Sequence, residues 1–325
     1  MENKIKGFAD KCQRIISEIQ KDLVGQDEVV RDTVTAMIAG GNVLLEGVPG
    51  VGKTRLVRSL GQAFNLPFSR IQFTPDLMPA DVTGTNVLET YPDGRSAIVF
   101  KKGPIFSGIV LADEINRATP KTQSALLEAM QEHKVTVSGE SYTLSEPFFV
   151  LATQNPIEQD GTYPLPEAQT DRFMFKLNVK FPTADQLYDI VAMTQKTMEE
   201  TASAVVTAEE LLDMRACAKE IPIMEQVMRY TMRLVCATHP ELSSSPDFTK
   251  KYLRFGASPR AAQALITAGK VHALMNGRYN VAYEDIEALA FPVLRHRVKP
   301  SYAAIADKLT ADDCIRELVK SVPKK

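Results

Sequence analysis

The chain has 325 residues, of which 44% are hydrophobic and 24% charged, as in ordinary globular proteins. This length is enough for two domains with substantial cores. The 38 lysines and arginines nearly balance 40 aspartates and glutamates, which leaves a formal charge of −2. The balance excludes a global electrostatic attraction to nucleic acid or to an anionic membrane, but not a local basic patch.

The cysteines and the apolar runs bear on redox chemistry and on membranes. Cys12, Cys217, Cys236 and Cys314 are scattered without C-x-x-C spacing, which favours reduced thiols over a zinc site or a disulfide framework. No run of about 18 apolar residues occurs, and the first residues lack the apolar core of a signal peptide. We therefore expect no membrane insertion and a cytoplasmic location.

The first 40 residues predict two helices joined by a turn. Residues 5–21 place apolar side chains on one side at helical spacing, and a second helix is expected to run from about residue 27 to residue 39. The turn between them contains Val24, Gly25 and Gln26. Two interpretations stand side by side: this turn lies against an adenine base, or it only joins two helices that pack on a sheet.

A glycine-rich segment carries the strongest functional signal. Residues 47–54 read Gly-Val-Pro-Gly-Val-Gly-Lys-Thr, after a short apolar run and before helical apolar spacing that reaches Phe64. Strand, glycine loop and helix are the context of the P-loop pattern G-x-x-x-x-G-K-[ST]. Glycines let backbone N–H groups surround a phosphate, and the helix N-terminus adds partial positive charge.

The P-loop predicts which residues hold a nucleotide and its metal ion. Lys53 is expected on the β- and γ-phosphates, and the Thr54 hydroxyl on Mg²⁺. The other predicted nucleotide-binding residues of this segment are Gly47, Val48, Pro49, Gly50, Val51, Gly52 and Arg55.

The next segment departs from a simple alternation of strands and helices. Residues 68–73 predict a second strand, and residues 75–83 predict a loop. Two β-prone runs, 84–91 and 96–100, flank a Pro-Asp-Gly turn and predict a hairpin. A βαβ repeat would place a helix in this interval.

Residues 109–114 form the second decisive stretch, because an apolar run ends in Asp113 and Glu114. In a P-loop enzyme the first acid lies at the strand tip and holds Mg²⁺ through water. The second acid polarises the water that attacks the γ-phosphate. We therefore predict Asp113 as a metal residue and Glu114 as a catalytic residue.

A helix, a second hairpin and another buried strand come next. Residues 119–131 predict the helix, residues 134–144 a hairpin around Gly139, and residues 148–153 the strand. Asn155 follows this strand. Its side chain either holds the attacking water or the γ-phosphate, or it belongs to an Asn-Pro turn.

The last predicted strand covers residues 174–179, and Arg172 lies just before it. Phe181-Pro-Thr marks a boundary, so we predict one domain over residues 1–182 and a helical domain over residues 183–325. Thr207 and Glu210 predict a capping box. Ser258 followed by Pro259 predicts the start of another helix.

With these residues placed, the chain resembles the MoxR family of AAA+ ATPases over nearly its whole length. The motifs that carry the resemblance are residues 47–54, 111–118, 121–130, 152–156, 163–169, 171–173 and 256–261.

The resemblance implies an α/β fold: a P-loop NTPase of AAA+ type, with a parallel five-stranded αβα sandwich and a C-terminal all-helical lid. It implies ATP and Mg²⁺ as ligands and Asn155 as the sensor 1 residue. Arg172 resembles the arginine finger, which inserts into the ATP site of a neighbouring subunit. Arg260 resembles sensor 2, which the lid carries to the γ-phosphate. A guanidinium near the γ-phosphoryl group accelerates transfer by about 10³–10⁵.

The resemblance also implies a homo-oligomer, usually a hexameric ring, that remodels a protein client with a partner bearing a von Willebrand factor type A domain. Both hairpins are expected to point toward a ring pore or a partner. One alternative is a DNA-associated motor, disfavoured by the charge of −2 and the absence of tryptophan for base stacking. Another is a nucleotide-gated scaffold with little turnover, disfavoured by the presence of Glu114 and Arg172.

Overall fold

A computed structural model describes residues 2–48, 50–156, 161–195 and 202–324. Five parallel strands form the central sheet, as predicted, in the order β2-β5-β8-β1-β9. Their bounds are β2 Phe68–Gln72, β5 Ile109–Asp113, β8 Phe149–Gln154, β1 Val43–Glu46 and β9 Phe175–Asn178. This order places the carboxyl ends of β1, β5 and β8, from which the P-loop, the acidic pair and Asn155 follow, at one edge of the sheet.

Each inner strand is apolar along its length because helices cover both faces of the sheet. Successive side chains point to opposite faces. Val43 and Leu45 accordingly join the core beneath one face, whereas Leu44 joins the core beneath the other.

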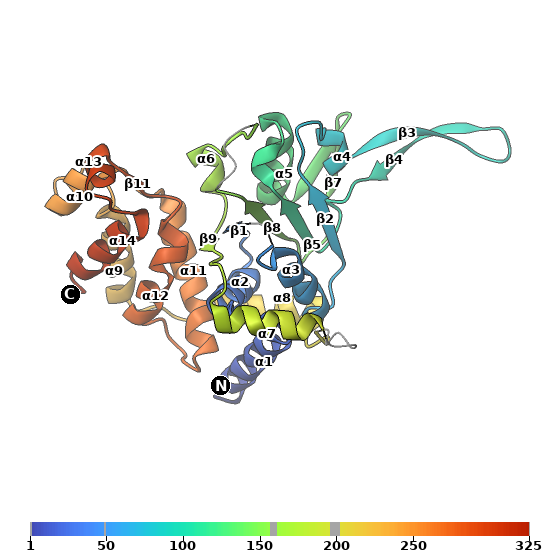
Figure 1. Cartoon of the computed structure of the whole chain (residues 1–325). Helices are drawn as coiled ribbons and strands as arrows, with labels where there is room; N and C mark the ends of the chain where they lie inside the picture. The colour runs from blue at the N-terminus through green and yellow to red at the C-terminus, as the bar shows by residue number, and fades with distance from the viewer. Residues whose placement is uncertain (1, 49, 157–160, 196–201, 325) are drawn as a thin grey trace.

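The helices of the first half divide between these two faces. The first face packs against α1 (Glu2–Gln20), α2 (Asp27–Ala39) and α3 (Lys53–Ala63). The second packs against α4 (Pro79–Thr83) and α5 (Pro120–Glu132). Figure 1 shows the resulting three layers, with α1 to α3 below the sheet and α5 above it. The predicted αβα sandwich is confirmed.

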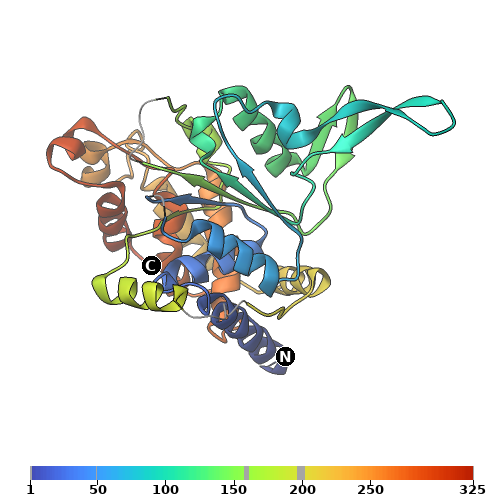
Figure 2. The ribbon, with the colours of Figure 1, turned by 45° about the vertical axis from the view of Figure 1, so that its right-hand side comes forward.

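Both predicted hairpins are present. The first comprises β3 (Gly84–Thr90) and β4 (Ser96–Lys102), and it projects far from the body of the molecule (Figures 1 and 2). The second comprises β6 (Lys134–Val137) and β7 (Glu140–Thr143). Phe100 stacks on Tyr142 with ring centroids 4.0 Å apart, so the base of the first hairpin rests on the second.

Within its described residues, the second half is helical apart from a short strand pair and an isolated bridge between Ile223 and Val281. The strand pair is antiparallel and joins β10 (Leu253–Phe255) and β11 (Lys299–Pro300), so the expectation of a lid made only of helices was incomplete. Strands of three and two residues are too short to show an alternating pattern in the sequence. The helices are α7 Ala184–Thr194, α8 Ala208–Lys219, α9 Glu225–Cys236, α10 Asp247–Tyr252, α11 Pro259–Met275, α12 Tyr283–Leu294, α13 Tyr302–Ala306 and α14 Ala311–Ser321.

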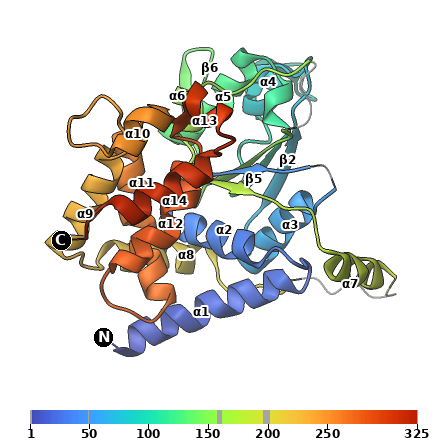
Figure 3. The same cartoon turned by 60° about the vertical axis from the view of Figure 1, so that its left-hand side comes forward.

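The helical half packs on the sandwich mainly through α11, which contacts α1 and α2 and shares one continuous core with them. Figure 3 shows the lid helices α9 to α14 on the left and toward the centre, whereas α7 lies apart from them at the lower right, below α3. The boundary between the two domains at residue 182 stays a prediction.

None of the helices in the described ranges is long and apolar enough to cross a membrane.

Local capping explains where two of the lid helices begin. The Thr207 hydroxyl accepts the N–H of Glu210, and the Glu210 carboxylate accepts the N–H of Thr207, as the sequence predicted. The Ser258 hydroxyl accepts the N–H of Arg260 at the start of α11. This cap fixes Arg260 in the first turn of the helix.

Candidate nucleotide site

The P-loop forms an open cradle between β1 and α3. Gly50 and Gly52 adopt φ angles of 83° and 87°, a region that favours glycine. No other group approaches the position of a Cβ atom at either residue, so space for a phosphate lies beside the backbone. Pro49, one of the predicted binding residues, lies outside the described residues.

Lys53 begins α3 and reaches back across the loop, where its ammonium group donates to the carbonyl oxygen of Gly47. Burial lowers the pKa of Lys53, whereas the carboxylates of Asp113, Glu114 and Glu46 raise it. A phosphate group bound in the loop would offer this half-buried cation a stronger acceptor than the carbonyl oxygen.

The predicted acids lie at the tip of β5, opposite the P-loop. The Thr153 hydroxyl on the neighbouring strand donates to Oδ1 of Asp113 at 2.6 Å and accepts the N–H of Glu114 at 2.8 Å. Glu114 has a φ of 55°, which is strained for a residue with a side chain. This turn separates the directions of two adjacent carboxylates, so they can serve different roles.

Three side chains that the sequence analysis missed hold these carboxylates. Arg70 Nη2 lies 2.6 Å from Oδ2 of Asp113. Gln72 Nε2 and Arg117 Nη1 both donate to Oε2 of Glu114, at 2.8 and 3.0 Å. Arg70 and Gln72 alternate on β2, which is an edge strand next to β5. Two polar side chains at alternate positions of a predicted strand were the available signal.

The P-loop and the acidic pair line one cleft of about 530 Å³. Asn155, at the end of β8, is buried and lines the same cleft, as well as a cavity of about 540 Å³ between the sheet and the lid. The residues that line the cleft are Gly50, Gly52, Lys53, Thr54, Arg55, Arg58, Arg70, Gln72, Asp113, Glu114 and Asn155.

The side chains and backbone groups in this cleft fit Mg²⁺ and a nucleoside triphosphate. Thr54 supplies a hydroxyl and Asp113 a carboxylate, the oxygen ligands that Mg²⁺ prefers. The glycine cradle and Lys53 supply the phosphate contacts. Arg55 also lines the cleft, and its Nε pairs with Asp22 Oδ1 at 3.0 Å.

The turn with Val24, Gly25 and Gln26 lies beneath α7 and is not among the described residues that line the cleft. A Cβ atom at Gly25 would fall 2.4 Å from Cδ of Gln186, so α7 packs directly on this glycine. Gln26 is buried and donates to the Lys180 carbonyl oxygen at 3.1 Å. These contacts support the packing role, and an adenine contact stays a prediction.

The other loop glycine and the loop valines lie nearer the core. A Cβ atom at Gly47 would fall 2.7 Å from the carbonyl oxygen of Val179, which explains the glycine there. Val48 and Val51 are half-buried, and Val51 packs on the core of the sandwich. Neither valine is among the described residues that line the cleft.

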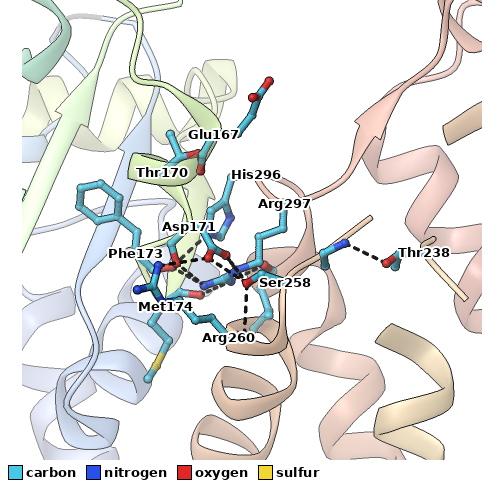
Figure 4. Close-up of polar contacts among 12 residues, drawn as sticks. Glu167, Thr170, Asp171, Phe173, Met174, Thr238, Ser258, Arg260, His296 and Arg297 are labelled. Carbon is cyan, nitrogen blue, oxygen red and sulfur yellow. Dashed lines mark hydrogen bonds and ion pairs between the residues drawn. The ribbon is translucent and has the colours of Figure 1, made fainter. Parts of the chain in front are cut away.

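Arg260 is linked to the residue beside Arg172, and neither arginine lies in the P-loop cleft. Neither belongs to the described lining of that cleft. Arg260 Nη1 lies 3.4 Å from Oδ2 of Asp171, the residue before Arg172 (Figure 4). The structure therefore links the predicted sensor 2 arginine to the residue before the predicted finger, and neither arginine lines the P-loop cleft of its own chain.

Comparison with known proteins agrees with this architecture. Residues 42–175 match the ATPase family associated with various cellular activities (AAA), and residues 247–318 match the AAA lid domain. A crystal structure of a protein from Cytophaga hutchinsonii superposes with a TM-score of 0.89 at 38% sequence identity, covering 99% of this chain and 97% of that chain.

Curated relatives extend the likeness over almost the whole chain. Chaperone MoxR1 of Mycobacterium tuberculosis is 40% identical over 95% of this chain and 81% of its own length. Protein MoxR of Methylorubrum extorquens is 30% identical over 97% of this chain and 96% of its own length. Matching family segments, a common fold and relatives of this identity place the chain in the MoxR family of AAA+ ATPases.

Proposed function

We propose that the chain hydrolyses ATP at a site completed by a second copy, and that it uses this hydrolysis to remodel a protein client. The proposal rests on one observation: the predicted arginines do not line the cleft that contains the P-loop of their own chain. The P-loop and the acidic pair line one cleft, whereas Arg172 and Arg260 are not among its described lining residues, and Arg260 pairs with Asp171, the residue before Arg172. A neighbouring copy that presents its two arginines to this cleft would complete the site.

Within the cleft, each polar group has a distinct task. Lys53 binds the β- and γ-phosphates, and Thr54 and Asp113 hold the metal ion, whose positive charge stabilises the phosphate oxygens. Glu114 accepts a proton from the attacking water, whose oxygen bonds to the γ-phosphorus. The bond from that phosphorus to the bridging oxygen breaks, and ADP leaves. Asn155, buried at the neighbouring strand tip, orients the water or the γ-phosphate.

The arginines from the second copy act on the charge of the transition state. Charge spreads over the γ-phosphoryl oxygens during transfer, and a guanidinium placed there contributes about 10³–10⁵ in rate. The copy that binds ATP thus supplies the base, while its neighbour supplies Arg172 and Arg260. This arrangement predicts that an isolated copy hydrolyses ATP slowly.

A head-to-tail contact of this kind closes naturally into a ring. Family membership supports a homo-oligomer, and we propose six subunits. It also supports a partner that bears a von Willebrand factor type A domain, with which the ring would mature or activate a protein complex.

The projecting β3–β4 hairpin supports a protein client more than a nucleic acid. Leu88 and Ile98 lie directly opposite each other on its two strands and are 70% and 73% exposed. An exposed apolar pair on a projecting element is typical of a surface that contacts protein. At the tip, Arg95 pairs with Asp93 at 2.6 Å, which reduces its attraction for phosphate.

The shared site is tested by mixing two inactive variants. Arg172→Ala lacks the finger, and Glu114→Gln lacks the base. With random assembly, about a quarter of the interfaces in an equal mixture join an intact base to an intact finger. We expect each variant alone to be inactive and the mixture to recover activity. A mixture no more active than its components would overturn the shared site.

A further inference from the structure

One buried side chain of the lid, Arg297, forms hydrogen bonds with the backbone on both sides of Arg172. This residue follows α12 in the lid, and its side chain is only 2% exposed. Figure 4 shows it directed at the segment that leads into β9. The segment comprises residues 171–174.

All five N–H groups of the Arg297 guanidinium are engaged. Nε donates to Oδ1 of Asp171 at 2.8 Å. Nη2 donates to the carbonyl oxygens of Asp171 and Phe173, at 3.1 and 2.7 Å. Nη1 donates to the carbonyl oxygens of Met174 and Val293, at 3.1 and 2.6 Å. Four of the five acceptors therefore belong to the residue before Arg172 and the two residues after it.

Besides Arg260, which pairs with Asp171, two other lid residues engage the same segment. The Ser258 hydroxyl contacts both carboxylate oxygens of Asp171, at 2.9 and 2.8 Å, and caps α11, whose first turn carries Arg260. His296 Nε2 lies 3.1 Å from the Phe173 carbonyl oxygen. Burial lowers the pKa of His296 well below its ordinary value, so the neutral ring donates this bond.

The site that Arg297 occupies requires the planar shape of a guanidinium as well as its positive charge. Burial lowers the pKa of Arg297, and Asp171 raises it by accepting a hydrogen bond and by its charge. A buried guanidinium is tolerated only when its donors are satisfied. A lysine would bring a point charge with three donors and could not reproduce the planar fork.

Arg172 itself has no comparable anchor. Within the described parts of the chain, no hydrogen bond or ion pair engages its guanidinium, and its only hydrogen bond there is from its backbone N–H to the Gln169 carbonyl oxygen at 3.2 Å. Its backbone position therefore depends on the residues that flank it, and those are held by the lid.

We propose that Arg297 is a positioning residue that fixes Arg172 for the ATP site of the neighbouring copy, with Asp171 linking the lid to both trans-acting arginines. The inference rests on the proposed shared site. Its consequence is that any movement of the lid moves Arg172 and Arg260 together, so the state of one copy governs hydrolysis in the next.

The test uses Arg297→Lys in the full-length chain, with Arg295→Lys as the matched control. Arg295 lies in the same turn and makes bonds of the same type, to Asp312 and to the Lys176 carbonyl oxygen, but it does not touch residues 171–174. We expect Arg297→Lys to lose at least about tenfold in kcat, as a misplaced trans arginine predicts. Its affinity for a fluorescent ATP analogue and its oligomeric mass should match those of the control.

Mixing then separates positioning from a merely structural role. Arg297→Lys has an intact base, so Glu114→Gln, which has an intact finger, should restore its activity. Arg172→Ala, which shares the finger defect, should not. Asp171→Asn should behave in the same way, and it serves as the second variant if Arg297→Lys unfolds at a lower temperature than the control.

The outcomes distinguish this inference from the proposed function. The positioning role is overturned if Arg172→Ala and Glu114→Gln complement each other but neither Arg297→Lys nor Asp171→Asn is restored by Glu114→Gln. It is overturned equally if Arg297→Lys keeps the kcat of the control. Failure of Arg172→Ala and Glu114→Gln to complement each other would overturn the shared site and, with it, the role of Arg297.

Discussion

The side-chain amide nitrogen of Gln72 lies 2.8 Å from Oε2 of Glu114, so the edge strand of the sheet holds the proposed catalytic base. A hydrogen bond donated to a carboxylate oxygen fixes the orientation of the carboxylate. It also occupies a lone pair that is then not available to water. This hydrogen bond therefore limits the ability of Glu114 to accept a proton from the attacking water.

Replacing Gln72 by alanine should raise the basal ATPase rate. Hydrogen bonds to charged groups contribute about 1.5–3 kcal/mol, and release of part of this energy predicts an increase of about 3- to 10-fold in kcat. The measurement is the steady-state rate at saturating ATP, with Ser69→Ala, on the same strand but outside the cleft lining, as the control. A rate at or below that of the control would show that Gln72 orients the base and does not restrain it.

Substitutions of Lys53 and Glu114 should affect different steps. Lys53→Ala removes a charged donor to the phosphates, so the Kd for ATP should rise about 10- to 100-fold. Glu114→Gln keeps the side-chain shape and should bind ATP with normal affinity, while kcat falls by about 10²–10⁴. Equilibrium binding and single-turnover hydrolysis separate the two effects. Weakened binding in Glu114→Gln would contradict the role of this residue as a base.

The parts of the site that the sequence predicted are those set by position along one strand or loop. The P-loop, the acids at the tip of β5 and the Asn155 position after β8 all follow from an apolar run and the residues just beyond it. The three inner strands, β1, β5 and β8, were recognisable for the same reason, since each is a short, buried apolar run.

The parts that the sequence did not predict depend on neighbours in space. Gln72 reaches Glu114 because β2 pairs with β5, and the order of strands in the sheet is not written in any one segment. Arg297 binds mainly backbone carbonyl oxygens, which every residue possesses, so no side-chain pattern marks its partners. The same limitation applies to Arg260, whose pairing with Asp171 depends on how the lid docks on the sandwich.

Arg260→Ala should lose activity in the same way as Arg172→Ala, because Arg260 pairs with Asp171, the residue before Arg172, and both are proposed to act on the neighbouring site. We expect Glu114→Gln to restore either variant in a mixture. Arg172→Ala and Arg260→Ala should not restore each other, because every interface then lacks one of the two arginines. If that last mixture recovered activity, Arg260 would act on the nucleotide of its own chain.

The last prediction concerns the acid stability of the lid. Asp285 is fully buried at the start of α12, where it contacts His272 Nδ1 at 2.6 Å, Arg278 Nη1 at 2.6 Å and the Ala282 N–H at 2.8 Å. Burial alone raises the pKa of Asp285, but these partners lower it below the ordinary value of 3.8.

Because the folded pKa is the lower one, the unfolded chain binds the proton more readily. The stabilisation from Asp285 is therefore complete above the ordinary value and is lost as the pH falls through the folded pKa. Asp285→Asn should lower the free energy of unfolding by about 1.5–3 kcal/mol at neutral pH, as loss of charged hydrogen bonds predicts. The difference from wild type should shrink below about pH 4. Urea unfolding measured from pH 7 to pH 3 tests this, with the exposed Asp247→Asn as the control; a difference that stays constant with pH would rule out the ionised carboxylate as its source.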